Sequence, residues 1–308
     1  MSSLTSALAQ ARSLLFVPGT KVERFAKALA SGADAIVLDL EDAVPPSEKD
    51  TARQAIAGIA NAISAAPVPV VVRINTLGSA LGLADTEWLQ ATPAIAHVMV
   101  PKTEQAQDLS ALHQRLPNLQ LIALIETALG LHHVHHIAAA PGVARLAVGH
   151  IDFLADLGMQ VSTGEPEIAP LRFNVAMATR LANLPPAIDG VTADFQNDEL
   201  LRQDTQRAIR YGFGGKLCIH PRQIEGVHTC FMPDAQQLQW AQRVVQADAQ
   251  AQGAAVQLDG KMVDLPVVLQ AQRILARLPQ HTADLNTLRM ANTKQLPKPP
   301  GLTTCTAH

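Results

Sequence analysis

Three carboxylates crowd into four residues of the sequence. Asp39, Glu41 and Asp42 follow the apolar run at residues 35–38. Like charges this close together are costly when buried unless cations or a metal ion offset them. One interpretation is a helix cap beside two solvated acids. The other is a site in which Glu41 and Asp42 orient a metal-bound water and a basic residue, which makes both of them candidate catalytic residues.

A single arginine follows another apolar run. Arg73 comes after Val70-Val71-Val72, a segment too hydrophobic for the surface edge of a sheet. A guanidinium in such a place needs anionic partners, and the carboxylates described above could supply them in a purely structural ion pair. Alternatively, Arg73 is catalytic and donates hydrogen bonds to an oxyanion as charge develops on a carbonyl oxygen.

Two isolated carboxylates follow two further apolar runs. Glu126 comes after residues 121–125, and Asp152 comes after residues 147–151. Two carboxylates completed by waters and substrate oxygens are the usual way of holding Mg²⁺, and Mn²⁺ could take its place. The alternatives are a helix cap at Glu126 with Thr127, or an acid–base dyad without a metal ion.

A basic segment near the N-terminus could bind phosphate. Lys21, Arg24 and Lys27 follow the turn Pro18-Gly19-Thr20, where a strand is expected to pass into a helix. The glycine pattern is neither a P-loop nor a dinucleotide fingerprint, so a solvated basic helix face is the alternative. His220, between Ile219 and Pro221, fits either a core imidazole or a substrate contact.

These residues belong to a regular succession of apolar runs and helical patterns. The eight runs predict strands near residues 14–17, 35–38, 68–74, 97–100, 119–125, 145–148, 187–188 and 216–219. Strict alternation of strand and helix predicts a parallel sheet, either closed as a TIM (β/α)8 barrel or open and doubly wound. We favour the barrel, because it gathers the strand ends around one mouth. Seven runs end on or beside a reactive side chain: Asp39, Arg73, Lys102, Glu126, Asp152, Asp189 and His220.

The alternation stops after Pro233. Residues 1–232 are therefore expected to form the barrel, and residues 233–279 a C-terminal arm or lid of helices around a hairpin at Asp259-Gly260-Lys261. Residues 280–308 have little apolar periodicity and are expected to form a poorly ordered tail.

Composition limits the classes of function. The net charge of −3 and pI of about 6.4 give no cationic face for nucleic acid or an anionic membrane. No run of 18 apolar residues could cross a bilayer. The three cysteines are an odd number without CxxC spacing, which favours a reducing compartment, and we expect a cytoplasmic protein.

Several segments in a fixed order carry a family resemblance. They are residues 12–19, 33–44, 72–75, 99–102, 125–127 and 214–221. Together they resemble the citrate lyase beta-subunit family, which also contains malyl-CoA and citramalyl-CoA lyases, over roughly residues 12–278. The resemblance implies a TIM barrel with magnesium on Glu126 and Asp152, Arg73 beside the reacting carbonyl, and a trimeric or hexameric assembly. It also implies coenzyme A over the mouth, with its phosphates near Lys21, Arg24 or Lys27.

The resemblance extends to the C-terminal arm. Met262-Val263-Asp264-Leu265-Pro266 matches a sequence whose aspartate reaches an active site, usually that of a neighbouring subunit, so Asp264 becomes the candidate proton-transfer residue. One departure is His150, where a smaller residue is frequent; it could narrow the oxoacid pocket.

The expected function is that of a magnesium-dependent carbon–carbon lyase. It would cleave a short acyl-CoA thioester, citramalyl-CoA or malyl-CoA, into acetyl-CoA and a 2-oxoacid, pyruvate or glyoxylate, by reversible Claisen-type chemistry. The alternatives are the citryl-thioester lyase subunit of a citrate lyase complex and a metal-dependent pyruvate aldolase. A catalytically silent coenzyme A-binding subunit is disfavoured, because the metal ligands, the arginine and the arm aspartate are all present.

Overall fold

The computed structural model describes residues 3–251 and 255–278. The chain divides into two compact units, one ending at Phe231 and the other beginning at Met232, and each is described here by itself. The tail expected at residues 280–308 lies outside the described residues.

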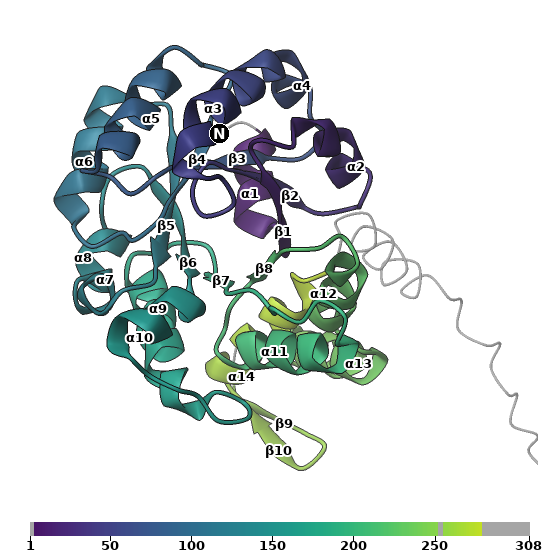
Figure 1. Cartoon of the computed structure of the whole chain (residues 1–308). Helices are drawn as coiled ribbons and strands as arrows, with labels where there is room; N and C mark the ends of the chain where they lie inside the picture. The colour runs from purple at the N-terminus through teal and green to yellow at the C-terminus, as the bar shows by residue number, and fades with distance from the viewer. Residues whose placement is uncertain (1–2, 252–254, 279–308) are drawn as a thin grey trace, which may run out of the picture. The chain divides into compact units, whose positions relative to one another are not determined.

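The first unit is a closed barrel of eight parallel strands, which confirms the predicted TIM fold (Figure 1). Each strand pairs with the next along the chain, and β8 returns to β1 through the register Leu14 to Leu217. The strands are β1 (Ser13–Pro18), β2 (Ala35–Asp39), β3 (Val70–Arg73), β4 (His97–Val100), β5 (Gln120–Ile125), β6 (Val143–Val148), β7 (Ile188–Asp189) and β8 (Gly215–Cys218).

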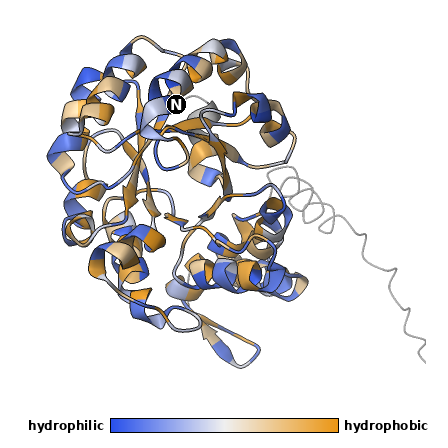
Figure 2. Cartoon of the chain, viewed as in Figure 1, coloured by the Kyte–Doolittle hydropathy of each residue, from blue (hydrophilic) through white to orange (hydrophobic). Residues whose placement is uncertain are grey.

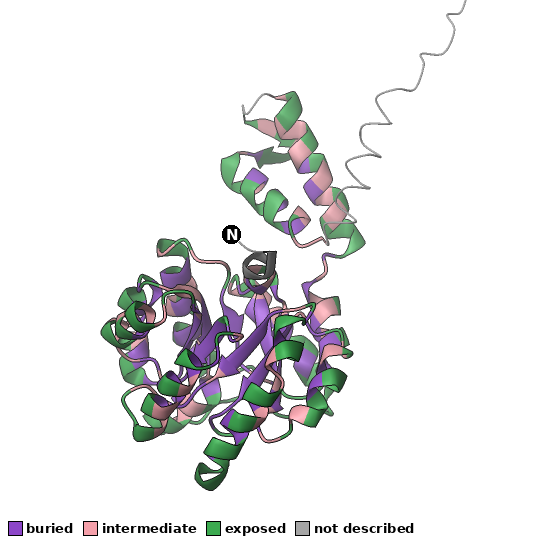
Figure 3. Ribbon diagram, turned by 90° about the horizontal axis from the view of Figure 1, so that it is seen from above, coloured by how far each residue is buried: buried purple, intermediate pink, exposed green. Residues whose placement is uncertain are grey.

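Strand side chains alternate between two apolar cores. Leu14 and Val37 belong to the smaller core, whereas their neighbours Leu15 and Ile36 belong to the larger one, which also contains residues of the surrounding helices. Period-two alternation on strands that are buried on both faces explains why the runs are continuously apolar (Figures 2 and 3).

Helices surround the strands. They are α1 (Ser3–Gln10), α2 (Phe25–Leu29), α3 (Lys49–Gly58), α4 (Ala60–Ser64), α5 (Ala80–Gln90), α6 (Ala106–Arg115), α7 (Ala128–His132), α8 (Val134–Ala138), α9 (His150–Leu157), α10 (Ala169–Leu181), α11 (Asp198–Arg210) and α12 (Gln223–Phe231). Three short 3-10 turns, Val22–Arg24, Pro46–Glu48 and Pro166–Ile168, precede α2, α3 and α10. Among the described residues, no helix is both long and apolar enough to cross a bilayer.

A buried arginine of the barrel binds the C-terminal end of helix α1 through hydrogen bonds. Nη1 of Arg145, on β6, donates to the carbonyl oxygens of Leu8 (2.9 Å) and Ala11 (2.8 Å). Its Nε and Nη2 donate to the carbonyl oxygen of Pro186, at 2.9 and 2.6 Å. A fully buried guanidinium is tolerated here because these carbonyls accept its hydrogen bonds.

The second unit contains α13 (Ala235–Gln250), a hairpin of β9 (Val256–Leu258) and β10 (Lys261–Val263), and α14 (Leu265–Leu275). Asp234 begins α13 with a reciprocal capping box to Gln237. Asp259 and Gly260 both have positive φ, 51° and 76°, as a two-residue type I′ hairpin turn requires. Buried residues of both helices and of β10 form a small separate core, for example Val244, Val263 and Val268.

Candidate active site

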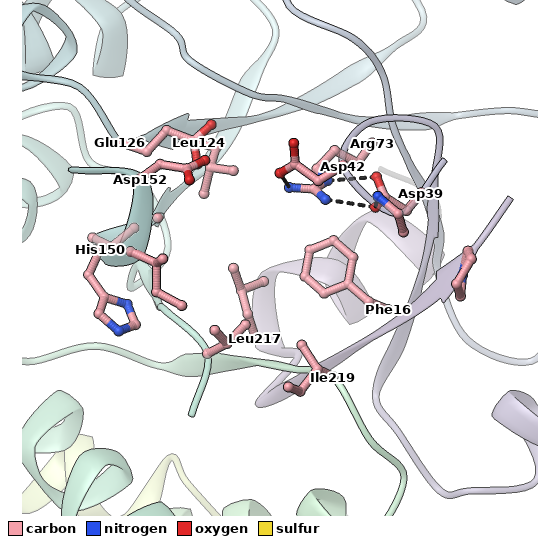
Figure 4. Close-up of a pocket in the computed structure, with 16 residues that line it drawn as sticks. Phe16, Asp39, Asp42, Arg73, Leu124, Glu126, His150, Asp152, Leu217 and Ile219 are labelled. Carbon is pink, nitrogen blue, oxygen red and sulfur yellow. Dashed lines mark hydrogen bonds and ion pairs between the residues drawn. The ribbon is translucent and has the colours of Figure 1, made fainter. Parts of the chain in front are cut away.

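A cavity of about 450 Å³ opens at the carboxyl ends of the barrel strands (Figure 4). Charged side chains from four parts of the barrel meet in it, and apolar side chains complete its wall. Because it lies where active sites of this fold are built, it is the candidate site. The polar lining residues are Asp39, Asp42, Arg73, Glu126, His150 and Asp152, and the apolar ones include Phe16, Leu124, Val148, Val191, Leu217 and Ile219.

Arg73 is clamped on one side of the cavity. Its Nε and Nη2 donate to the two carboxylate oxygens of Asp39, both at 2.7 Å, and its Cζ lies 4.9 Å from the centre of the Phe16 ring. Nη1 lies 2.9 Å from Glu41 Oε2 and 3.4 Å from Asp42 Oδ2. Despite its burial, these carboxylates raise the pKa of Arg73.

One hydrogen on Nη2 of Arg73 remains free of these pairs. A guanidinium has five N–H donors, and three of them donate hydrogen bonds here, from Nε and Nη2 to Asp39 and from Nη1 to Asp42. The 2.9 Å approach of Nη1 to Glu41 Oε2 is an ion pair without a hydrogen bond. The structural and functional interpretations of Arg73 are therefore compatible, since a residue held by ion pairs still faces the cavity with a donor to spare.

Glu126 is a buried carboxylate on the opposite side. It follows β5, is 2% exposed, and accepts a 2.7 Å hydrogen bond at Oε1 from the backbone N–H of Lys102. Burial, reinforced by repulsion from Glu41 and Asp152, raises the pKa of Glu126 to about 8. A cation bound beside it would reverse this shift by stabilising the ionised form.

A glycine makes room for the Glu126 carboxylate. A Cβ placed on Gly149 would lie 2.1 Å from Glu126 Oε2 and 2.7 Å from Glu126 Cβ. Gly149 precedes α9, whose first turn carries Asp152. The prediction placed Asp152 beside the end of a strand; it lies instead on this helix, which brings its carboxylate beside Glu126 (Figure 4).

The donor set fits a hard cation such as Mg²⁺. Glu126 and Asp152 line the same cavity, and the described residues contain no cluster of three or more His, Cys, Asp or Glu side chains arranged for a metal ion. Two carboxylates alone suit Mg²⁺, which keeps several waters or substrate oxygens, better than Zn²⁺, which favours a nearly complete set of protein ligands.

Lys102 connects the two sides. Its Nζ lies 2.6 Å from Glu41 Oε1 and 3.6 Å from Asp152 Oδ2. Glu41 is itself buried, and burial raises its pKa against the attraction of Arg73 and Lys102. The sequence placed Lys102 at a strand end without giving it a role, because none of its three carboxylate partners is near it in the chain.

Other predicted residues lie outside the cavity lining. Lys21, Arg24 and Lys27 are exposed on the segment between β1 and the end of α2. His220 is also exposed, so it is not a core imidazole, and its ring stacks on Phe195 with centroids 4.6 Å apart. Asp264, in the second unit, caps α14 by accepting from the backbone N–H of Val267 at 3.4 Å.

Asp189, expected at the barrel mouth, is fully buried in a charge network. Its carboxylate accepts from Nε of Arg172 at 3.1 Å, and Arg172 also pairs with Glu165 at 2.9 Å. Burial raises the pKa of Asp189, but the positive charges of Arg172 and Lys216 lower it by a larger amount. The net shift of the pKa is therefore downward. His150 joins this network through its Nε2, 3.7 Å from Glu165 Oε1.

Comparison with known proteins identifies the family. A family model described as HpcH/HpaI aldolase/citrate lyase matches residues 12–221. The citrate lyase subunit beta of Haemophilus influenzae is 32% identical over 281 residues, which covers 86% of this chain and 96% of that protein. A (3S)-malyl-CoA thioesterase of Cereibacter sphaeroides is 33% identical over 273 residues, covering 86% and 94%.

A solved structure agrees with these matches. The crystal structure of protein CitE from Mycobacterium tuberculosis, in complex with magnesium, acetoacetate and coenzyme A, superimposes with a TM-score of 0.77 at 34% identity. It covers 87% of this chain, and this chain covers 98% of it. By sequence and by fold, the chain belongs to the HpcH/HpaI aldolase/citrate lyase family.

Proposed function

We propose that the chain is a magnesium-dependent carbon–carbon lyase of the cytoplasm. Its substrate would be a short 3-carboxy-3-hydroxyacyl-CoA, citramalyl-CoA or malyl-CoA, and its products acetyl-CoA and pyruvate or glyoxylate. The observation that carries this proposal is the pairing of Glu126 and Asp152 opposite Arg73 in one cavity. Magnesium and coenzyme A in the related CitE crystal structure support it.

The two carboxylates would hold the cation, and Arg73 would hold the developing negative charge. A bound Mg²⁺ lowers the pKa of a chelated hydroxyl group and polarises the carbonyl that forms from it. A base takes the proton of the C3 hydroxyl group as the bond between C2 and C3 of the acyl chain breaks, and the electron pair of that bond stays on the acetyl-CoA fragment as an enolate. The free Nη2 hydrogen of Arg73 is the available donor to that enolate oxygen, and a preorganised donor of this kind typically contributes about 10²- to 10³-fold to the rate.

Asp264 would complete the reaction by protonating the enolate carbon. Its assignment rests on the match of residues 262–266 to the family's arm sequence. In the family this aspartate usually serves a neighbouring subunit, so we propose a homo-oligomer, a trimer or hexamer. Lys21, Arg24 and Lys27 are proposed to contact the phosphates of coenzyme A, with His220 as a further contact; all four are exposed.

The proposal is tested by measuring acetyl-CoA release from malyl-, citramalyl- and citryl-CoA, with Mg²⁺ and with EDTA. Metal-dependent release of both acetyl-CoA and a 2-oxoacid supports the lyase and identifies its acyl group. Release of free coenzyme A with an intact hydroxyacid would indicate instead a thioesterase, as the Cereibacter relative is named.

Two other outcomes would favour the remaining alternatives. Turnover of a citryl thioester only on an acyl carrier protein would favour a subunit of a citrate lyase complex. Aldol cleavage without any coenzyme A ester would favour a pyruvate aldolase. Calorimetry tests the metal ligands separately from turnover. The variants Glu126→Gln and Asp152→Asn should each bind Mg²⁺ more weakly than the unaltered protein.

A further inference from the structure

Lys102 has an unusual backbone conformation beside the carboxylates of the site. Its φ is +43°, in the left-handed region that non-glycine residues seldom adopt. The following residue fixes this turn, because Thr103 donates through its backbone to Leu124 (3.2 Å) and through its hydroxyl to Val100 (2.8 Å). In this conformation the N–H of Lys102 reaches Glu126 Oε1 at 2.7 Å.

The side chain of the same residue reaches the other acids of the site. Nζ lies 2.6 Å from Glu41 Oε1 and 3.6 Å from Asp152 Oδ2, so Lys102 contacts three separate carboxylates. Arg73 cannot neutralise all of them, since Asp39 already engages two of its nitrogens. Lys102 thus places a positive charge beside the proposed metal ligands: its ammonium lies 3.6 Å from Asp152, and its backbone N–H holds Glu126.

We infer that Lys102 is a built-in counter-cation of the carboxylate cluster, which weakens the binding of a divalent cation and makes that binding dependent on an anionic ligand. This inference rests on the proposed function, because it takes Glu126 and Asp152 as the metal ligands. In this role Lys102 lowers the affinity of the site for the metal ion while its side chain remains paired with Glu41.

The expected sign follows from comparing two opposing effects of Lys102. Its ammonium orders Asp152 only weakly, because the contact is 3.6 Å long and the two side chains are 36% and 38% exposed. A unit positive charge within a few ångströms of a divalent cation repels it strongly even at a protein-like dielectric constant. Removing the ammonium should therefore tighten cation binding by about tenfold or more.

The test measures Mg²⁺ affinity by calorimetry at pH 8.5 for the full chain and its variants. Lys102→Met keeps the length of the side chain and removes its charge, whereas Lys102→Arg keeps the charge. Lys102→Gly also removes the charge and relieves the positive φ, so it remains informative if the methionine variant folds poorly. Arg115→Gln is the control for net charge: Arg115 is exposed at the end of α6, and its Nη2 donates to Gln90 Oε1 at 2.8 Å.

The inference predicts tighter Mg²⁺ binding in Lys102→Met and Lys102→Gly, and unchanged binding in Lys102→Arg and Arg115→Gln. Oxalate, a dianion resembling an enolised oxoacid, should strengthen binding to the unaltered protein more than to Lys102→Met. Equal or weaker Mg²⁺ binding in both neutral variants would overturn the inference. Failure of the unaltered protein to bind Mg²⁺ at all, with or without oxalate, would instead overturn the proposed function.

Discussion

Replacing Gly149 by alanine should damage the site through a single methyl group. The backbone of Gly149, with φ −107° and ψ 74°, is accessible to alanine, so the effect is steric. The new Cβ would lie 2.1 Å from Glu126 Oε2 and 2.7 Å from Glu126 Cβ, where ordinary contacts are at least 3.4 Å. The carboxylate oxygen must therefore move by more than 1 Å, and the main chain must also yield, because a Cβ cannot swing away on its own.

A displacement of about 1 Å at a catalytic group commonly costs about 10²-fold in rate. Overpacking of this kind also costs about 1–3 kcal/mol of unfolding free energy. We expect Gly149→Ala to remain folded, to bind Mg²⁺ more weakly in calorimetry, and to release acetyl-CoA about 10²-fold more slowly. The matched control is Gly58→Ala at the end of α3, where nothing outside the helix's own backbone and the two adjacent residues lies within 4 Å of the new Cβ; stability there should be unchanged or higher.

The decisive comparison is between metal affinity and stability. If Gly149→Ala were destabilised but bound Mg²⁺ and turned over substrate like the unaltered protein, Glu126 could not be a metal ligand in the geometry described. If it lost both activities while Gly58→Ala kept them, the close approach of α9 to Glu126 would be established as a requirement of the site.

Three further outcomes are expected. Arg73→Lys, which cannot reproduce the two-pronged contact with Asp39, should fold but lose about 10²- to 10³-fold in kcat, measured with circular dichroism as the folding control. Asp264→Asn should leave α14 capped and the thermal midpoint of unfolding nearly unchanged, because asparagine is an equally good cap. The same variant should form acetyl-CoA more slowly by about 10²-fold or more, and normal turnover would exclude Asp264 as the proton donor. Without a metal ion, in EDTA, the pKa of Glu126 is about 8 in the folded protein and 4.5 in the unfolded chain. Because the folded state holds the proton more tightly, the free energy of unfolding should fall by a few kcal/mol as the pH rises from 4.5 to about 8. Urea titrations at several pH values should show this slope reduced in Glu126→Gln.

The strands were predictable because burial on both faces leaves a strong local signal. All eight runs became barrel strands, including the two-residue β7, Ile188–Asp189. The apolar periodicity of helix α5 is weak, because it buries Asp85, which accepts hydrogen bonds from the backbone and side-chain N–H groups of Asn75 at 2.6 and 2.7 Å. A polar residue on the inner face obscures helical periodicity, and its partner lies on another element.

Partners on distant elements also limited the prediction of the site. Sequence order placed Arg73 and Glu126 at strand ends, and barrel closure brought them to one cavity. It placed Asp189 there too, but a buried partner on α10, Arg172, engages that carboxylate instead. Which acids remain available depends on side chains from distant elements, and no local pattern records those pairings. Asp264 came from the family resemblance alone.

The Arg145 anchor makes the first helix of the chain dependent on residues synthesised much later. The donors that hold Leu8 and Ala11 come 137 and 134 residues further along. At roughly 5–20 residues per second, the ribosome adds Arg145 about 7–27 s after Leu8, so α1 lacks this contact during that interval. Closing the bottom of the barrel is thus a late event in biogenesis, and a nascent chain stalled before β6 should still expose its N-terminal helix to proteases.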